Sequence, residues 1–216
     1  MTETRKQNIC IVILAGGKSS RMGQPKELLE WDGKPLIEHL VQTVCRTGLP
    51  CVIVSNWPER LPEEVRLLPQ VEVKRDAWPS RGPISGILTA MTSTDADAYL
   101  VFACDLPFLE TEHVQRMIGY AQTLAADAAL AKTAQREHPL FGVYHRRTKP
   151  VWERSLANGE YRVMSAVSQM KWVPLEENWL DCWVTFNMNT PHDYEIAVRE
   201  RIRRKREQGK DGNNFV

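Results

Sequence analysis

Short apolar runs alternate with longer amphipathic stretches along most of this chain, and this alternation constrains the fold more than any other feature of the sequence. The first run, Ile9–Leu14, is continuously apolar and rich in β-branched residues, which is typical of a strand buried on both faces of a sheet. Similar runs predict further strands at 51–54, 71–74, 98–103, 127–131, 140–144, 172–173 and 182–186. Apolar residues at helical spacing predict helices at 35–45, 83–91, 111–125, 151–156, 163–170 and from Pro191 onward. The expected fold is therefore α/β, with a mostly parallel central sheet flanked by helices.

Composition and charge narrow the class of protein further. The 216 residues include 28 Lys and Arg against 27 Asp and Glu, and 43% of them are hydrophobic. This mix is that of an ordinary globular domain, and it argues against a disordered chain or a broad nucleic-acid-binding surface. The apolar run that ends at Ala15 is far shorter than the roughly 20 residues that a membrane span needs. Because the sequence has no internal repeat and no linker, we expect one domain.

Cysteine usage and the N-terminus indicate a cytoplasmic protein. The five cysteines include no Cys-x-x-Cys pair, and their odd number is typical of reduced thiols rather than of disulfides or a zinc site. Residues 1–8 are polar and lack the pattern of a signal peptide. We therefore expect the protein in the cytoplasm.

The segment after the first expected strand carries most of the chemistry. Residues 14–26 read Leu-Ala-Gly-Gly-Lys-Ser-Ser-Arg-Met-Gly-Gln-Pro-Lys, and ligands of open α/β sheets bind beyond the carboxyl ends of the strands. Gly16 and Gly17 let the backbone approach a ligand closely, and successive amide groups in such a turn bind anions. Arg21 and Lys26 add the positive charge that a departing pyrophosphate requires. We interpret the loop as a triphosphate-binding site.

Two commoner phosphate-binding motifs do not fit this loop. A Walker A motif, Gly-x4-Gly-Lys-Ser/Thr, requires Lys and Ser or Thr directly after its second glycine, whereas Gly23 is followed by Gln24 and Pro25. The dinucleotide fingerprint Gly-x-Gly-x-x-Gly is also absent. A glycine-rich turn with solvated basic side chains is the remaining alternative, and the spacing of Arg21 and Lys26 after a buried strand disfavours it.

The same residues resemble a known family. Leu-Ala-Gly-Gly-x3-Arg-Met-Gly-x2-Lys, followed by Leu-Leu and Gly-Lys-Pro-Leu at 33–36, is similar to the nucleotidyltransferases that activate sugars, methylerythritol and molybdopterin. Four later segments make the chain most similar to the molybdenum cofactor guanylyltransferases: Gly-Pro-Ile-Ser-Gly at 82–86, Cys-Asp-Leu-Pro-Phe at 104–108, Pro-Leu-Phe-Gly-Val-Tyr at 139–144 and Phe-Asn-Met-Asn-Thr-Pro at 186–191. The resemblance extends from about Ile9 to about Tyr194.

The resemblance implies a single-domain, Rossmann-like nucleotidyltransferase. A nucleotide-binding half would span about 8–110 and a molybdopterin-side half about 111–198, followed by a basic helical tail at 199–216. The implied reaction transfers GMP from GTP to the molybdopterin-bound molybdenum cofactor in the presence of Mg²⁺, and releases pyrophosphate. GTP and the molybdopterin cofactor are thus the expected partners. Other proteins of cofactor assembly stay open as partners, whereas nucleic acid and membranes are not expected.

Polar residues at the ends of two predicted strands are candidates for the reaction centre. Asp105 follows a buried strand, and Mg²⁺ typically uses one or two carboxylates together with phosphates and water. The alternative is an Asp that caps a turn, but the resemblance implies a magnesium aspartate here. Asn187 and Asn189 alternate, so they point the same way in an extended segment. The resemblance favours an active-site role for them over turn formation before a Thr190 helix cap.

The expected nucleotide site combines the loop with later strand ends. A carboxylate at Asp76 would accept hydrogen bonds from the N1–H and N2–H₂ groups of guanine, although a ribose contact or a solvated loop position stays open. Asn56 is expected to touch base or ribose, and Gly82 and Gly86 to allow close approach. The resemblance implies the nucleotide-binding set Leu14, Ala15, Gly16, Gly17, Lys26, Asn56, Asp76, Gly82, Gly86 and Asp105, with Lys26, Arg21 and Asp105 as catalytic residues.

Basic residues of the C-terminal half are candidates for the second substrate, whose phosphate is anionic: Arg136, His138, Arg146, Arg147 and Arg162. Arg162 lies in a Gly-x-x-Arg segment that resembles one of the family, whereas Arg146 and Arg147 fit a solvated surface equally well. His138 is a candidate general base. However, a phosphate nucleophile is already ionised at pH 7, so the transfer needs no strong base.

Two other functions and one charged segment stay open at this stage. A cytidylyltransferase that acts on molybdopterin or another phosphorylated alcohol is the alternative enzyme. Relatives on the cytidine side, however, usually have Ala-Ala-Gly where this chain has Ala-Gly-Gly at 15–17. A nucleotide-binding adaptor without catalysis is the alternative class. Residues 199–210 contain seven Lys or Arg against two Glu, which indicates either a solvated helix end or a surface for a partner or the anionic cofactor.

Overall fold

A seven-stranded sheet forms the centre of the computed structural model, which describes residues 7–17, 22–133, 136–175 and 179–211, the last four by their backbone alone. Its strand order is β5-β4-β1-β6-β8-β7-β9. The strands are β1 Ile9–Leu14, β4 Cys51–Ser55, β5 Val71–Arg75, β6 Ala98–Ala103, β7 Ala128–Lys132, β8 Glu137–His145 and β9 Trp172–Pro174. Only β8 runs antiparallel to its neighbours β6 and β7 within this sheet. The expectation of an α/β fold with a mostly parallel sheet is confirmed.

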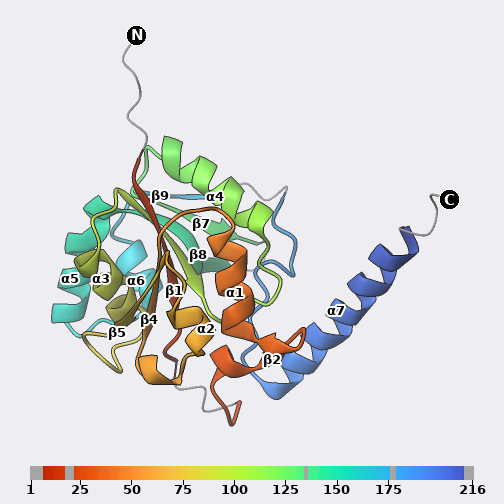
Figure 1. Cartoon of the computed structure of the whole chain (residues 1–216). Coiled ribbons are helices and arrows are strands. Elements are labelled where there is room, and N and C mark those ends of the chain that lie inside the picture. Colours follow the sequence, from red (N-terminus) through yellow and green to blue (C-terminus); the bar gives the residue numbers. More distant parts are fainter. Residues whose placement is uncertain (1–6, 18–21, 134–135, 176–178, 212–216) are drawn as a thin grey trace.

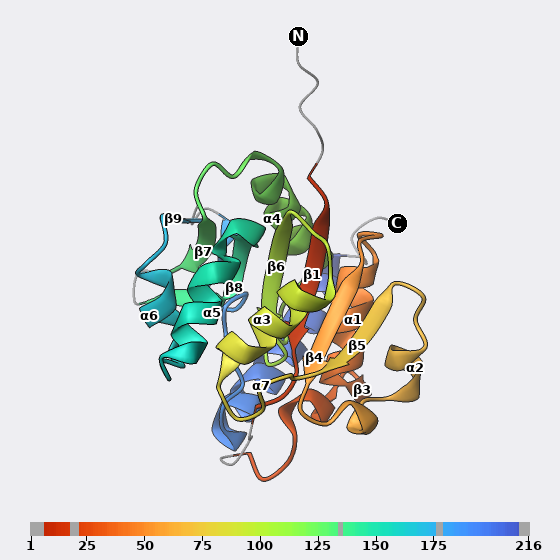
Figure 2. The same cartoon turned by 90° about the vertical axis from the view of Figure 1, so that its left-hand side faces the viewer.

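Helices cover both faces of this sheet (Figures 1 and 2). On one face lie α1, α4 and the first part of α7, and on the other lie α3, α5 and α6. The helices are α1 Leu36–Cys45, α2 Glu63–Arg66, α3 Pro83–Ser93, α4 Thr111–Thr123, α5 Lys149–Ala157, α6 Val163–Val167 and α7 Pro191–Asp211. Short 3₁₀ turns add η1 Lys26–Leu28, η2 Pro58–Arg60 and η3 Arg146–Thr148.

The apolar residues of β1 explain why two cores form. Ile9, Ile11 and Ile13 pack in the core beneath α1 and α4, whereas Cys10 and Val12 pack in the core beneath α3 and α5. Successive side chains of a strand point to opposite faces, so a continuously apolar run supplies both cores. The burial of β1 on both faces fixes it at the centre of the sheet.

Two expected elements differ in the structure. The strand expected at 182–186 is a series of turns, because Asp181 Oδ1 accepts hydrogen bonds from the amides of Trp183 and Val184 at 2.8 Å each. Such side-chain acceptors compete with strand pairing. The helix expected over 163–170 ends at Val167, where the chain turns toward β9.

A small antiparallel hairpin lies outside the main sheet. Its strands are β2 Glu30–Trp31 and β3 Lys34–Pro35, and they are joined at Asp32 and Gly33. Both turn residues have positive φ, 53° and 80°, which a tight two-residue hairpin of the I′ type requires. The hairpin follows η1 directly and connects it to α1.

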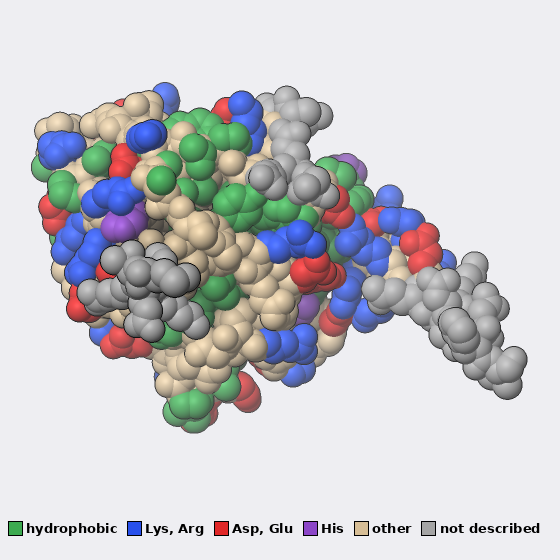
Figure 3. All heavy atoms as spheres, turned by 90° about the horizontal axis from the view of Figure 1, so that it is seen from above, with side chains coloured by type: hydrophobic (Ala, Val, Ile, Leu, Met, Phe, Trp, Pro, Cys, Tyr) green, Lys and Arg blue, Asp and Glu red, His purple; other side chains and the backbone are tan. Residues whose placement is uncertain are grey.

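Helix α7 begins on the body and points away from it toward its C-terminal end (Figure 1), while Arg201, Arg204 and Lys205 still reach side chains of the body. The extended part carries acidic and basic side chains mixed together (Figure 3). Arg203 pairs with Glu200 and Glu207 of the same helix at 2.7 Å. Among the described residues, no helix is long and apolar enough to span a membrane.

Candidate active site

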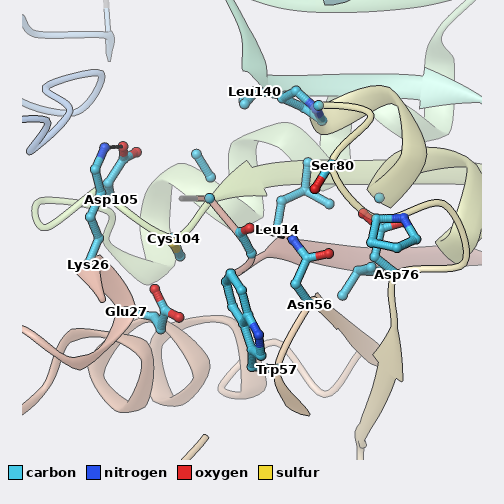
Figure 4. Close-up of a pocket in the computed structure, with 18 of the residues that line it drawn as sticks. Leu14, Lys26, Glu27, Asn56, Trp57, Asp76, Ser80, Cys104, Asp105 and Leu140 are labelled. Atoms are coloured by element: carbon cyan, nitrogen blue, oxygen red, sulfur yellow. Dashed lines mark hydrogen bonds and ion pairs between the residues drawn. The ribbon is translucent and has the colours of Figure 1, made fainter. Parts of the chain in front are cut away.

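The carboxyl ends of β1, β4, β5 and β6 meet at one edge of the sheet and border a cavity of about 1000 Å³ (Figure 4). Nearly all of the described residues that were expected to bind nucleotide line it: Leu14, Gly16, Gly17, Lys26, Asn56, Asp76, Gly82, Gly86 and Asp105. Ala15 is fully buried in the core beneath them, and its amide donates to the carbonyl of Val54 at 2.8 Å. Arg21 lies outside the described residues.

Four polar side chains form a hydrogen-bonded cluster at one end of this cavity. Lys26 Nζ donates to Asp105 Oδ2 at 2.9 Å and to Asn189 Oδ1 at 2.6 Å. Asn187 Nδ2 donates to Asp105 Oδ1 at 2.6 Å. Both Lys26 and Asp105 are more than four-fifths buried, so their ion pair is only partly screened by water. The alternation of the two asparagines does bring both amides to the same place, as the sequence predicts.

Backbone hydrogen bonds hold the three segments of this cluster together. Asp105 lies two residues beyond β6, and its carbonyl oxygen accepts a hydrogen bond from the Met188 amide at 3.1 Å. Thr190 and Asp193 cap α7 reciprocally, since each side chain accepts from the other's amide, at 3.2 and 2.8 Å. This capping box fixes the start of α7 directly after the asparagines. The expectation of a Thr190 cap agrees with this geometry.

The donor set at Asp105 fits a metal that is shared with a substrate. Among the residues that the structure describes, no three His, Cys, Asp or Glu side chains gather into a metal-binding group. A single carboxylate cannot enclose an ion by itself. It matches the coordination of Mg²⁺, which keeps several waters and binds one or two carboxylates together with substrate phosphates.

Asn56 and Gly16 pack tightly at the middle of the cavity. Asn56 Nδ2 donates to the carbonyl oxygen of Gly16 at 2.5 Å, and a Cβ on Gly16 would lie 2.8 Å from that nitrogen. Asn56 Oδ1 is buried, and no described residue donates a hydrogen bond to it. Buried acceptors are rarely left unsatisfied, so this oxygen is available to a donor group on a ligand. A Cβ on Gly86 would likewise lie 2.8 Å from Leu14 Cδ2.

Asp76 joins the loop after β5 to the start of α3. Its Oδ2 accepts from Ser85 Oγ at 2.7 Å, and its Oδ1 accepts from the Trp78 amide at 2.9 Å. The half-buried carboxylate is therefore held in place by its neighbours. Thr89 Oγ1 also lies 3.5 Å from Oδ1, so Oδ2 is the oxygen that keeps a second lone pair for a ligand donor. Gly82, with φ of 71°, ends this loop where α3 begins.

Two further candidates, His138 and Arg162, are not among the described residues that line the cavity. His138 is 8% exposed, and its Nε2 lies 3.2 Å from Thr133 Oγ1. Burial lowers the pKa of His138 to about 4, so its imidazole is neutral at pH 7. Arg162 precedes α6, and the carbonyl of its neighbour Tyr161 packs against Gly82.

The other basic candidates divide into one near the cluster and two remote ones. Arg136 Nη2 lies 3.5 Å from Asn187 Oδ1. Arg146 pairs with Asp95 at 2.7 Å and Arg147 with Asp127 at 2.6 Å. The last two therefore stabilise the surface beside η3.

Glu27 is a residue of this cavity that sequence reasoning missed. It follows Lys26 in η1, is only 2% exposed, and lines the cavity beside Cys104 (Figure 4). Its Oε2 atom is buried and finds no hydrogen-bond partner within the described part of the chain, and burial raises its pKa. The only signal in the sequence is its position next to the candidate lysine. A solvated acidic residue has the same appearance there.

Comparison with known proteins gives one consistent family. The model for the MobA-like NTP transferase domain matches residues 11–171. A probable molybdenum cofactor guanylyltransferase of Carboxydothermus hydrogenoformans is 34% identical over 198 residues, which are 89% of this chain and 96% of that relative. One from Bacillus licheniformis is 33% identical over 85% of this chain and 93% of its own length.

Solved structures with the same fold include a molybdopterin-guanine dinucleotide biosynthesis protein A from Archaeoglobus fulgidus. It superposes with a TM-score of 0.75 at 24% identity, over 91% of this chain and 99% of its own. A protein of Aquifex aeolicus superposes with a TM-score of 0.65 at 28% identity, over 85% and 94% of the two chains.

Proposed function

Because the chain belongs to the family of MobA-like NTP transferase domains, we propose that it transfers GMP from GTP to the molybdopterin-bound molybdenum cofactor. The phosphate of the cofactor would attack the α-phosphorus of GTP, and the bond from that phosphorus to the β-phosphate oxygen would break. The products are the guanine dinucleotide cofactor and pyrophosphate. The relatives that match over most of both chains support this reaction by their names.

The observation that carries the proposal is the cluster of Lys26, Asp105 and the two asparagines at one end of the cavity. Lys26 would leave Asp105 to neutralise the departing pyrophosphate. Asp105 would hold a divalent ion, for which we propose Mg²⁺, and that ion supplies further charge neutralisation when bound. The glycine backbone at 16–17 would bring amide groups to the phosphates. Catalysis of this kind consists of positioning and electrostatics.

No general base is required in this scheme. The attacking phosphate is ionised at pH 7, and the pKa of His138, lowered by burial to about 4, is too low for efficient proton transfer at that pH. Arg136 is better placed to bind the incoming phosphate, since its guanidinium lies beside Asn187. We assign Arg162 to the pterin side on the strength of the family resemblance alone.

At the other end of the cavity, guanine would meet Asp76 Oδ2, which keeps a second lone pair, and the unsatisfied Oδ1 of Asn56. These acceptors suit the N–H groups of guanine or the hydroxyl groups of ribose. Gly82 and Gly86 would allow the nucleoside to approach the start of α3. Within this single domain, residues of about 8–110 would bind the nucleotide and those of about 111–198 the molybdopterin.

The five free cysteines are compatible with a reducing compartment, so we also propose a cytoplasmic location. Partners beyond the two substrates would be other proteins of cofactor assembly or acceptor enzymes.

Release of pyrophosphate tests the proposal directly. The purified protein is mixed with Mg²⁺, molybdopterin-bound molybdenum and either GTP or CTP. Pyrophosphate and a guanine dinucleotide product are expected with GTP. Faster release with CTP would identify a cytidylyltransferase, and binding of GTP without any release would favour the non-catalytic adaptor. Omission of the metal should abolish release.

A further inference from the structure

We propose that Asp32 is a positioning residue, which acts by anchoring helix α7 and thereby holds the two active-site asparagines against Lys26 and Asp105. The inference rests on the proposed function and concerns the same site. It assigns a task to the C-terminal helix, which lies outside the residues 11–171 that match the family model.

The active-site cluster is assembled from segments far apart in the sequence. Lys26 begins η1, which runs directly into the β2–β3 hairpin. Asn189 lies two residues before α7. Lys26 is thus joined along the chain to the β2–β3 hairpin, and Asn189 is joined to α7. The relative position of the hairpin and α7 therefore determines whether the contact forms.

Three side chains join the hairpin to α7. Arg201 donates to Asp32 Oδ2 from Nε at 2.8 Å and from Nη2 at 2.6 Å. Lys205 Nζ lies 2.6 Å from Asp32 Oδ1. One turn after the start of the helix, Tyr194 Oη donates to the carbonyl oxygen of Glu30 at 2.9 Å.

The geometry of Asp32 favours a specific contact over a chance surface ion pair. Its side chain and that of Arg201 are each 25% exposed, and the bond from the guanidinium uses two nitrogens. Charge-assisted hydrogen bonds of this kind give geometric specificity as well as energy. Asp32 is one of the two residues of a tight turn and has a left-handed backbone, so its carboxylate is carried by a short and well-defined segment.

The neighbouring arginine on α7 packs on the body in a second way. The guanidinium of Arg204 lies 5.0 Å from the centre of the Phe108 ring, which packs edge-on against Trp31 of β2 at 5.4 Å. Arg204 also pairs with Asp181 at 3.1 Å. By contrast, Arg203 pairs only within the helix among the described contacts, so it offers a matched control on the same turn.

The test compares Asp32→Asn, Arg201→Gln, their double variant and the control Arg203→Gln. Asn tolerates a left-handed turn position, so Asp32→Asn removes the charge without disturbing the hairpin. Two quantities are measured in each full-length variant: hydrogen exchange of the Met188 amide, which bonds to Asp105, and the steady-state constants of GMP transfer.

We expect Met188 exchange to accelerate at least fivefold in Asp32→Asn and in Arg201→Gln. In the same variants kcat falls at least threefold, while the affinity for GTP, measured by calorimetry, changes less than twofold. The double variant should be no more impaired than Asp32→Asn alone, because Asp32→Asn already removes the ion pair with Arg201. Arg203→Gln should leave exchange and kcat at their wild-type values.

Unchanged Met188 exchange in Asp32→Asn would overturn the inference, and so would faster exchange with an undiminished kcat. Equal effects in the Arg203→Gln control would show a general loss of helix stability instead. If the wild-type protein transfers no GMP, the proposed function fails. The exchange measurement then still decides whether Asp32 holds the asparagine segment.

Discussion

Replacement of Lys26 by Met should change metal binding and catalysis in opposite directions. In the ligand-free protein the Lys26 ammonium lies 2.9 Å from Asp105 Oδ2 and competes with any cation for that carboxylate. During transfer the same ammonium is needed on the departing pyrophosphate. Met keeps most of the apolar stem and removes the charge, so the two effects can be separated in one variant.

The size of each effect follows from the geometry. Coulomb's law at 2.9 Å gives about 1.4 kcal/mol with the screening of bulk water and about 6 kcal/mol at an effective dielectric constant of 20. Even the lower value corresponds to roughly tenfold tighter binding of a divalent ion in the absence of nucleotide. Loss of one preorganised group that stabilises transition-state charge typically costs about 10²- to 10³-fold in kcat.

Binding of Mn²⁺ is followed by electron paramagnetic resonance and transfer by pyrophosphate release. Lys34→Met is the matched control, because Lys34 is half exposed and pairs with Glu38 on the surface at 2.7 Å. Equal Mn²⁺ affinities in Lys26→Met, the control and the wild type would refute the competition argument. A transfer rate within threefold of the wild type would refute the role of Lys26 at the pyrophosphate.

Three further predictions concern buried groups. The NMR titration of His138 should have its midpoint near pH 4, because burial lowers its folded-state pKa. The stability that the neutral imidazole contributes should therefore be lost as the pH falls from about 6.5 toward 4. A midpoint above pH 6 would contradict the lowered pKa. Gly86→Ala should lower the free energy of unfolding by about 1–3 kcal/mol, because its Cβ would clash with Leu14. Gly119→Ala should instead raise it by up to about 1 kcal/mol, because the space around Gly119 on α4 is open. Urea titrations measure both changes. Glu27→Gln should raise the melting temperature more at pH 8 than at pH 4. Burial raises the folded-state pKa of this carboxyl, so its cost grows as the pH rises from the unfolded-state pKa to the raised folded-state pKa; an equal gain at both pH values would exclude this origin.

The parts of the fold that could be predicted are those in which burial leaves a pattern in the sequence. The apolar run of β1 and the helical spacing of α1 and α3 predicted their elements within a few residues. The β2–β3 hairpin was not predicted, because strands of two residues show no periodicity in the sequence. Its Asp-Gly pair is nevertheless a hairpin signal. The turns at 182–186 were predicted as a strand because apolar residues there mask the local effect of Asp181.

The candidate site was predictable to the extent that strand ends determine it. Polar residues after parallel strands are expected to meet at one edge of the sheet, and this expectation, together with the family resemblance, identified Lys26, Asp105 and the asparagines as a group. The contact of Asp32 with Arg201 was not predictable. Surface ion pairs between distant segments obey no spacing rule, and their partners are selected only by the packed fold. The functional roles of all these residues stay predictions.

The reversed direction of β8 has a consequence for how relatives of this nucleotidyltransferase could come to use other acceptor substrates. Since β8 runs against β6, the edge that carries Asp105 receives the start of β8 and therefore the β7–β8 connection, next to Thr133 and Arg136. On the proposed function, the crossovers of the parallel half would border the nucleotide, whereas Thr133 and Arg136 would face the incoming group. Exchange of that connection between relatives should therefore alter which phosphate is accepted, and leave the choice of nucleotide intact.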